Sequence, residues 1–291
     1  MKNEDAEVLR LLGYDPENCR EIGHTELNRH AVFAAGNEIV KLYGDCDGID
    51  AGAHARAEQK YSALARERGV NAPVTLRIGT MAGCAYTVSE RLPGVPVPGD
   101  AGMEIWHQIG RLLGAFHSPV PLGGVAWLAE WLAYCRACAE TAVKQPCEER
   151  DKRVITAAVE LLIAQAQPER FAVLPLGTCH GDFSTRNVLV ENDHVTGVID
   201  FELAHEGNVE LELACLCRAE FGDQPQRASA FMKGYREAAF LSKKFSSRLP
   251  LYLAGEALFS CSWSFEKVPD HFRESVDWLA KFADGNKNIQ L

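Results

Sequence analysis

The side chains best suited to chemistry lie between residues 179 and 202. The chain reads Cys-His-Gly-Asp-Phe-Ser-Thr-Arg-Asn and then, after two apolar runs, Ile-Asp-Phe-Glu. Asp182 can accept the proton of an attacking hydroxyl group. Asn187 and Asp200 offer the hard oxygen ligands that magnesium prefers beside phosphate oxygens and water. Together these three residue types, at this spacing, predict phosphoryl transfer from a nucleotide.

The segment between Asn187 and Asp200 predicts a β-hairpin. Residues 188–190 and 195–199 are short apolar runs rich in β-branched side chains, and a polar turn, residues 191–194, separates them. Such a pattern is typical of two paired strands. Since a hairpin brings its outer ends together, we expect Asn187 and Asp200 to face one site. Asp182 lies on the loop before the hairpin, where it can reach the substrate.

The string His-Gly-Asp-x-x-x-x-Asn, followed by Ile-Asp-Phe-Glu, resembles the aminoglycoside phosphotransferase and choline kinase superfamily. The resemblance implies an α+β, bilobal, protein-kinase-like fold, with a small N-terminal β-sheet lobe and a larger, mainly helical C-terminal lobe. It also implies ATP and Mg²⁺ as cofactors, with GTP as the alternative nucleotide. A turn-rich stretch begins at Leu92. We therefore expect the nucleotide-binding lobe in residues 1–92 and the catalytic and substrate-binding lobe in residues 93–291.

The N-terminal third contains the two further polar groups that the resemblance requires. Residues 38–43 alternate as a strand, and within them Lys41 resembles the family's phosphate-binding lysine. Residues 51–68 have the apolar spacing of a helix. On this helix, Glu58 resembles the ion-pair partner of the lysine.

Two other segments are expected at the nucleotide. Residues 87–91 lie where the resemblance places the hinge whose backbone reads adenine, and Glu90 is assigned to the nucleotide site with them. The loop that covers the phosphates falls within residues 22–33. It contains one glycine, Gly23, so its backbone has less freedom to approach phosphate closely.

Charge gives an indication of the substrate. The chain has 40 Asp and Glu against 30 Lys and Arg, and most of the excess lies in residues 94–291. An acidic cleft attracts cations and repels nucleic acid. Glu202 and Glu206 lie nearest to the chemistry and are the first candidates for substrate contacts. We therefore expect a small hydroxylated, cationic acceptor, foremost an aminoglycoside antibiotic, which would make the protein a resistance enzyme, and no nucleic-acid partner.

Other functions remain open. Choline, homoserine, a macrolide or a peptide antibiotic would suit the same motif, because the motif concerns nucleotide chemistry and not the acceptor pocket. A nucleotide-binding pseudokinase and a helical structural protein with a fortuitous motif are alternatives of other classes. Magnesium-dependent ATP turnover with an acceptor separates an enzyme from a pseudokinase. ATP-dependent thermal stabilisation separates both from a structural protein. The sequence does not determine the oligomeric state.

Composition fits a globular enzyme. The chain has 291 residues, of which 47% are hydrophobic and 24% charged, and this usage is ordinary for globular proteins. No apolar run approaches the roughly 20 residues of a membrane span, and the acidic start lacks the hydrophobic core of a secretion signal. We therefore expect a cytoplasmic protein without a membrane partner. The ten cysteines lack zinc-site spacing and are expected to be free thiols.

Overall fold

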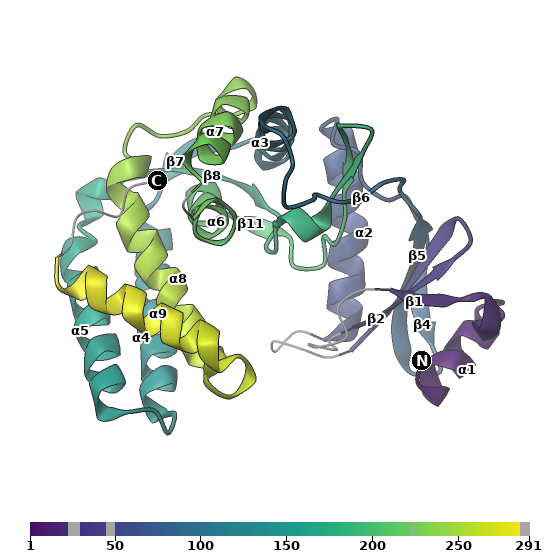
Figure 1. The fold of residues 1–291 in the computed structure, drawn as a ribbon, viewed down its shortest axis with the longest axis horizontal. Coiled ribbons are helices and arrows are strands. Elements are labelled where there is room, and N and C mark those ends of the chain that lie inside the picture. Colours follow the sequence, from purple (N-terminus) through teal and green to yellow (C-terminus); the bar gives the residue numbers. More distant parts are fainter. Residues whose placement is uncertain (23–29, 45–49, 223, 286–291) are drawn as a thin grey trace. The chain divides into compact units, whose positions relative to one another are not determined.

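The computed structural model of the protein describes residues 1–22, 30–44, 50–222 and 224–285. An antiparallel sheet forms much of the N-terminal region and helices dominate the C-terminal part (Figure 1), so the expected α+β class is confirmed. The chain forms two compact units, each built from several segments. Unit 1 comprises Met1–Ser118, Thr178–Glu206 and Ser229–Ala239, and unit 2 comprises Pro119–Gly177, Gly207–Ala228 and Phe240–Leu291. These units group the hairpin between Asn187 and Asp200 with the N-terminal sheet, and the lobe boundary after residue 92 stays a prediction.

A five-stranded antiparallel sheet of order β1–β2–β3–β5–β4 forms the N-terminal part of unit 1. Helix α1 packs on one face through apolar side chains, and helix α2 packs against β3, β4 and β5. The predicted strand at residues 38–43 and the helix at residues 51–68 are both confirmed. The elements are α1 (Asn3–Leu11), η1 (Pro16–Asn18), β1 (Arg20–Ile22), β2 (His30–Ala35), β3 (Glu38–Tyr43), α2 (Ala51–Glu67), β4 (Thr75–Met81) and β5 (Cys84–Glu90).

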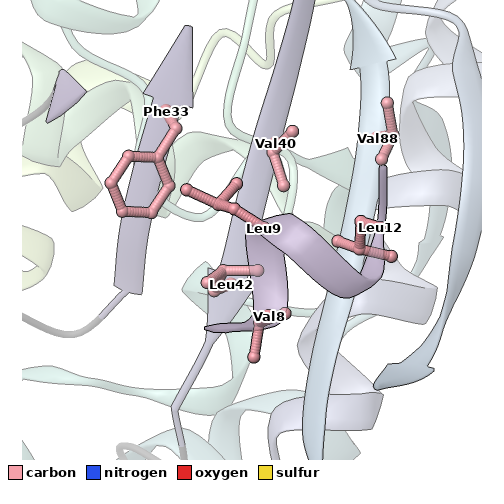
Figure 2. Close-up of a cluster of buried hydrophobic side chains, with 7 residues drawn as sticks. All are labelled: Val8, Leu9, Leu12, Phe33, Val40, Leu42 and Val88. Atoms are coloured by element: carbon pink, nitrogen blue, oxygen red, sulfur yellow. The ribbon is translucent and has the colours of Figure 1, made fainter. Parts of the chain in front are cut away.

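The alternation of β3 decides which of its side chains face each helix. Val40 and Leu42 belong to the cluster under α1 that Figure 2 shows, together with Val8, Leu9, Leu12, Phe33 and Val88. Tyr43 instead packs with Ala55 of α2 and with Ala85. Because successive strand residues point to opposite faces, Lys41 lies on the same side as Tyr43. The hydrophobic pattern of β3 therefore directs Lys41 toward α2.

The rest of unit 1 contains the hairpin and the helices beside it. The predicted hairpin is confirmed: β9 and β10 pair antiparallel, with Val188 opposite Val198. The turn residues Asn192 and Asp193 have φ of 50° and 61°, as tight hairpin turns require. The elements are β6 (Val95–Pro96), α3 (Met103–His117), η3 (Thr185–Asn187), β9 (Val188–Glu191), β10 (His194–Val198) and α7 (Pro225–Ala238), the last of which joins unit 1 from residue 229.

Helices α3 and α7 approach so closely that only glycine fits where they touch. A Cβ on Gly110 would lie 2.0 Å from the carbonyl oxygen of Phe231, and one on Gly234 would lie 2.0 Å from that of His107. We expect Gly110→Ala to lower the free energy of unfolding by roughly 1–3 kcal/mol, because the helices must separate to admit the methyl group. Gly99→Ala is the matched control, since its Cβ would meet no atom within 4 Å. Urea unfolding measures both variants, and equal losses would contradict the close approach.

Unit 2 consists mainly of packed helices. Arg248 and Glu210 form a fully buried ion pair in which Nη2 and Oε2 lie 2.6 Å apart, and the hydroxyl of Tyr252 donates to the same carboxylate at 3.0 Å. The paired strands β7 and β8 are not predicted from the sequence, which indicates helices interrupted by the hairpin alone. The elements are β7 (Val120–Gly123), α4 (Val125–Lys144), α5 (Glu149–Gln165), η2 (Pro168–Arg170), β8 (Val173–Cys179), β11 (His205–Asn208), α6 (Val209–Leu216), the π-helical turn η4 (Cys217–Phe221), α8 (Phe245–Lys267) and α9 (Pro269–Ala283), with β8 and β11 crossing the boundary of the units. Among the helices in the described ranges, none combines the length and apolar character needed to span a membrane.

Candidate active site

Lys41 lies at the centre of a group of carboxylates. Its ammonium contacts Asp200 Oδ1 and Glu202 Oε2, and Glu58 Oε2 lies 3.7 Å from it. The structure thus brings Lys41 and Glu58 together, as the sequence predicts, although Asp200 and Glu202 are its nearer partners. Burial works to lower the pKa of Lys41, but the surrounding negative charges outweigh it and hold the pKa well above its usual value. Lys41 is therefore a fixed cation.

The hairpin brings Asn187 and Asp200 to one end. The backbone N–H of Ile199 donates to the carbonyl oxygen of Asn187 at 2.9 Å, so the residues that flank the two strands lie side by side. Asp200 has φ of 74°, in the left-handed region that costs a residue with a side chain roughly 1–2 kcal/mol. The close ion pair with Lys41 helps to hold it there. Strain of this kind is concentrated at functional sites.

The loop before the hairpin is held by His180. Its Nε2 donates to the carbonyl oxygen of Ile199 at 3.0 Å, and its Nδ1 accepts from the backbone N–H of Asp182 at 3.4 Å. Gly181 has φ of 84°, and a Cβ there would lie 2.2 Å from the carbonyl oxygen of Leu203. Both ring nitrogens of His180 are thus hydrogen-bonded to backbone groups. This agrees with a role in orienting the loop and not with proton transfer.

Asp182 is contacted by two residues of the following turn. The Nδ2 of Asn187 donates to the Asp182 carbonyl oxygen at 2.8 Å and lies 3.3 Å from Oδ2. The Nη2 of Arg186 donates to Oδ1 at 2.8 Å. Arg186 is not among the site residues predicted from the sequence, although its position four residues after Asp182 within the motif could have singled it out. The expected base and the expected metal ligand Asn187 are therefore in direct contact.

Glu202 is held from two sides. The backbone N–H of Gly44 donates to Nδ1 of His30 at 3.1 Å, so a ring hydrogen lies on Nε2 and is donated to Glu202 Oε1 at 3.0 Å. Burial alone would raise the pKa of Glu202, but this hydrogen bond and the charge of Lys41 lower it to about 2. Glu202 is thus a permanent anion beside Lys41.

The remaining predictions concern contacts with a substrate or with a nucleotide. Glu206 is exposed, and its Oε1 accepts from the hydroxyl of Thr178 at 3.0 Å. Glu90 is the last residue of β5 and is also exposed. Its backbone N–H donates to the carbonyl oxygen of Val74 at 3.0 Å. Contacts of Glu202 and Glu206 with a substrate, and of Glu90 with a nucleotide, stay predictions. In the expected phosphate-covering loop, residues 23–29 lie outside the described part of the chain.

Asn187 and Asp200 offer oxygen ligands that suit a magnesium ion. Carboxylate oxygens of Glu58, Asp200 and Glu202 also lie within 4.8 Å of one another, but these three groups surround the ammonium of Lys41. Oε2 of Glu58 is buried and accepts no hydrogen bond from the described residues. Asn187 uses its Nδ2 on Asp182, which leaves its amide oxygen as the group suited to a cation. A set of hard oxygen ligands of this kind suits magnesium.

The pKa of Glu58 predicts a pH dependence of stability. Burial raises this pKa from 4.5 to about 7, although the charge of Lys41 opposes the rise. Between these values the folded protein keeps a proton that the unfolded chain releases, so folding stability falls as the pH increases. We expect the stability of the wild type relative to Glu58→Gln to fall by up to ~3 kcal/mol over this window. Urea unfolding at a series of pH values measures it, with Glu67→Gln on the exposed end of α2 as the matched control. A difference that does not change with pH would contradict the raised pKa.

Comparison with known proteins shows the family of this chain. A model of the phosphotransferase enzyme family (APH) matches residues 33–244. A homoserine kinase of Granulibacter bethesdensis (strain ATCC BAA-1260 / CGDNIH1) is 27% identical over 214 residues, which are 66% of this chain and 63% of that protein. In both curated homoserine kinases that match, the aligned part is less than two thirds of the relative's length.

Solved structures show the fold. A thermostable mutant of aminoglycoside phosphotransferase APH(4)-Ia, in ternary complex with AMP-PNP and hygromycin B, has a TM-score of 0.70 at 16% identity, and the match covers 99% of this chain and 100% of that one. A choline/ethanolamine kinase family protein from Mesorhizobium loti has a TM-score of 0.64 at 17% identity over 97% of this chain and 92% of that one. The expected bilobal, protein-kinase-like fold is confirmed.

Proposed function

Because this chain belongs to the phosphotransferase enzyme family, we propose that it transfers the γ-phosphoryl group of ATP to a hydroxyl group of a small, cationic molecule. The observation that carries the proposal is the assembly of Lys41, Asp182, Asn187 and Asp200 within unit 1. These groups supply a phosphate-binding cation, a proton acceptor and two oxygen ligands. A cytoplasmic site of action, where ATP is present, is part of the same proposal.

On the nucleotide side, Lys41 binds the α- and β-phosphates and Glu58 holds the lysine in place. The ammonium is now shared among three carboxylates, so arriving phosphate oxygens enter a site where the cation is already positioned. Asn187 and Asp200 would hold Mg²⁺, which would neutralise negative charge on the phosphate groups. Such preorganised charge supplies a large share of phosphoryl-transfer catalysis.

On the acceptor side, Asp182 orients the substrate hydroxyl group and takes its proton. The hydroxyl oxygen forms a bond to the γ-phosphorus while the bond between that phosphorus and the β–γ bridging oxygen breaks. The electron pair of the broken bond leaves with ADP, and the hydroxyl proton passes to the carboxylate of Asp182. Positioning contributes more to the rate than the base does in reactions of this kind.

Two acceptors are the leading candidates. An aminoglycoside is the first, supported by the acidic balance of residues 94–291 and by the shared fold with a phosphotransferase that has hygromycin B bound. Homoserine is the second, supported by sequence similarity to two homoserine kinases. Both carry an ammonium group and a free hydroxyl group, so the same nucleotide chemistry serves either, although the carboxylate of homoserine balances its positive charge. Antibiotic resistance would follow from the first.

Turnover of a defined acceptor panel tests the proposal. ADP release is measured with Mg²⁺-ATP and aminoglycosides, homoserine, choline, macrolides or cationic peptide antibiotics, and ³¹P NMR identifies the phosphate ester formed. Asp182→Asn, purified in parallel, excludes a contaminating kinase. Turnover of an aminoglycoside supports the full proposal, and turnover of homoserine alone replaces the acceptor. Nucleotide binding without transfer to any of these acceptors would favour a pseudokinase, and absence of nucleotide binding would contradict the proposal.

A further inference from the structure

The short turn that carries Asn187 also places a cation beside the proposed base. Turn η3 is fixed by two backbone hydrogen bonds, from the N–H of Asn187 to the carbonyl oxygen of Ser184 at 3.0 Å and from the N–H of Val97 to that of Thr185 at 3.2 Å. Within this turn Asn187 is buried and Arg186 is exposed. The two neighbours therefore reach Asp182 from opposite sides, Asn187 from the interior and Arg186 from the solvent.

The arrangement decides how a substrate can reach Asp182. The side chain of Asp182 is 36% exposed and that of Arg186 is 52% exposed. Asn187 occupies the inner side of the aspartate, so a hydroxyl group has to approach from the solvent side. There Nη2 of Arg186 lies 2.8 Å from Oδ1. An acceptor held on this exposed side of Asp182 would bring the transferred phosphoryl group near the guanidinium.

Arg186 is also a cation of the site with donors to spare. Lys41, by contrast, is enclosed by Asp200 and Glu202, and its side chain is only 12% exposed. Arg186 has five N–H donors, and the hydrogen bond to Asp182 accounts for only one of them. A planar guanidinium can bind two phosphate oxygens at once while it stays near a carboxylate.

We propose that Arg186 contacts the γ-phosphoryl group of bound ATP and stays with it during transfer, so that it is a catalytic residue in addition to Asp182. The inference rests on the proposed function. As the acceptor oxygen bonds to the γ-phosphorus and the bond to the β–γ bridging oxygen breaks, Arg186 neutralises charge on the equatorial oxygens. It gives up no proton, because the hydroxyl proton passes to Asp182. Removal of one such donor costs roughly 10²- to 10³-fold in rate.

A comparison of two nucleotides tests the contact without an acceptor. The thermal midpoint of the wild type is measured with Mg²⁺-ADP and with Mg²⁺-AMP-PNP. The difference between the two midpoints reports contacts to the γ-phosphate. We expect Arg186→Met to keep the shift caused by ADP and to lose most of the additional shift caused by AMP-PNP, and Arg186→Lys to retain part of it. Arg56→Met is the matched control, because Arg56 forms an exposed ion pair with Asp50 at 3.8 Å in the same unit.

Turnover supplies the second readout. With the acceptor found in the panel, kcat of Arg186→Met should fall roughly 10²- to 10³-fold, and guanidinium added to Arg186→Ala should restore part of it. An unchanged AMP-PNP increment together with an unchanged kcat would overturn the role of Arg186 while the proposed function stands. A wild type that neither nucleotide stabilises would overturn the proposed function, and the inference with it. Melting points measured without nucleotide show whether each variant is folded.

Discussion

Replacing Asp200 with asparagine should lower kcat by roughly 10³-fold or more, about 4 kcal/mol of transition-state stabilisation. Asp200 contacts the ammonium of Lys41, and in the proposed function it would hold Mg²⁺ together with Asn187. The substitution removes its negative charge and leaves its size nearly unchanged. Asparagine also tolerates the left-handed backbone that Asp200 adopts at φ 74°. The loss should therefore come from charge and not from refolding of the hairpin end.

The measurement is turnover as a function of Mg²⁺ concentration, with Mn²⁺ as a second metal. A residue that holds the metal shifts the concentration needed for half-maximal activity upward as well as lowering kcat. Asp193→Asn is the matched control, because Asp193 also has a positive φ, 61°, and lies in the turn of the same hairpin, exposed to solvent. It should keep full activity. If Asp200→Asn lost activity with an unchanged Mg²⁺ requirement, its role would be limited to positioning Lys41.

Local patterns explain why much of the site could be predicted from the sequence. The hairpin between Asn187 and Asp200 follows from two apolar runs about a polar turn, and its pairing then places the flanking residues together without further information. Likewise, alternation along β3 is sufficient to put Lys41 on the opposite side from Val40 and Leu42. In these cases the relevant interactions lie within a few residues, or within one strand pair.

Other features depend on contacts between residues far apart in the chain. Glu202 meets His30 across 172 positions of sequence, and no local pattern indicates that this acid would be held beside Lys41. In the sequence, the helices α4 and α5 separate the paired strands β7 and β8. Neither strand therefore has a partner nearby in the chain from which it could be predicted. The left-handed backbone of Asp200 is likewise imposed by its surroundings, since its residue type does not demand it. Each of these features is determined by tertiary contacts, which a local sequence pattern does not contain.

The second large effect is expected at Asp182, the base assigned to the reaction. Asp182→Asn should lower kcat by roughly 10²- to 10⁴-fold, the range that general-base catalysis contributes, with the affinity for Mg²⁺-ATP nearly unchanged. The asparagine oxygen can still accept from Arg186, whose Nη2 lies 2.8 Å from Oδ1. The amide lacks the negative charge and the proton affinity of the carboxylate. The substitution thus removes the chemistry and keeps most of the local geometry.

Separate measurements of binding and turnover decide between catalysis and structure. ATP affinity is measured by fluorescence or calorimetry, and kcat with the acceptor identified in the panel, for the wild type, Asp182→Asn and the exposed control Asp100→Asn. A catalytic role predicts loss of kcat alone in Asp182→Asn. A parallel loss of ATP affinity would mean that the Asp182 side chain acts mainly by holding Asn187, whose Nδ2 lies 3.3 Å from Oδ2 of Asp182. In that event Asp182 would serve the site by positioning the metal ligand Asn187 and not by accepting a proton.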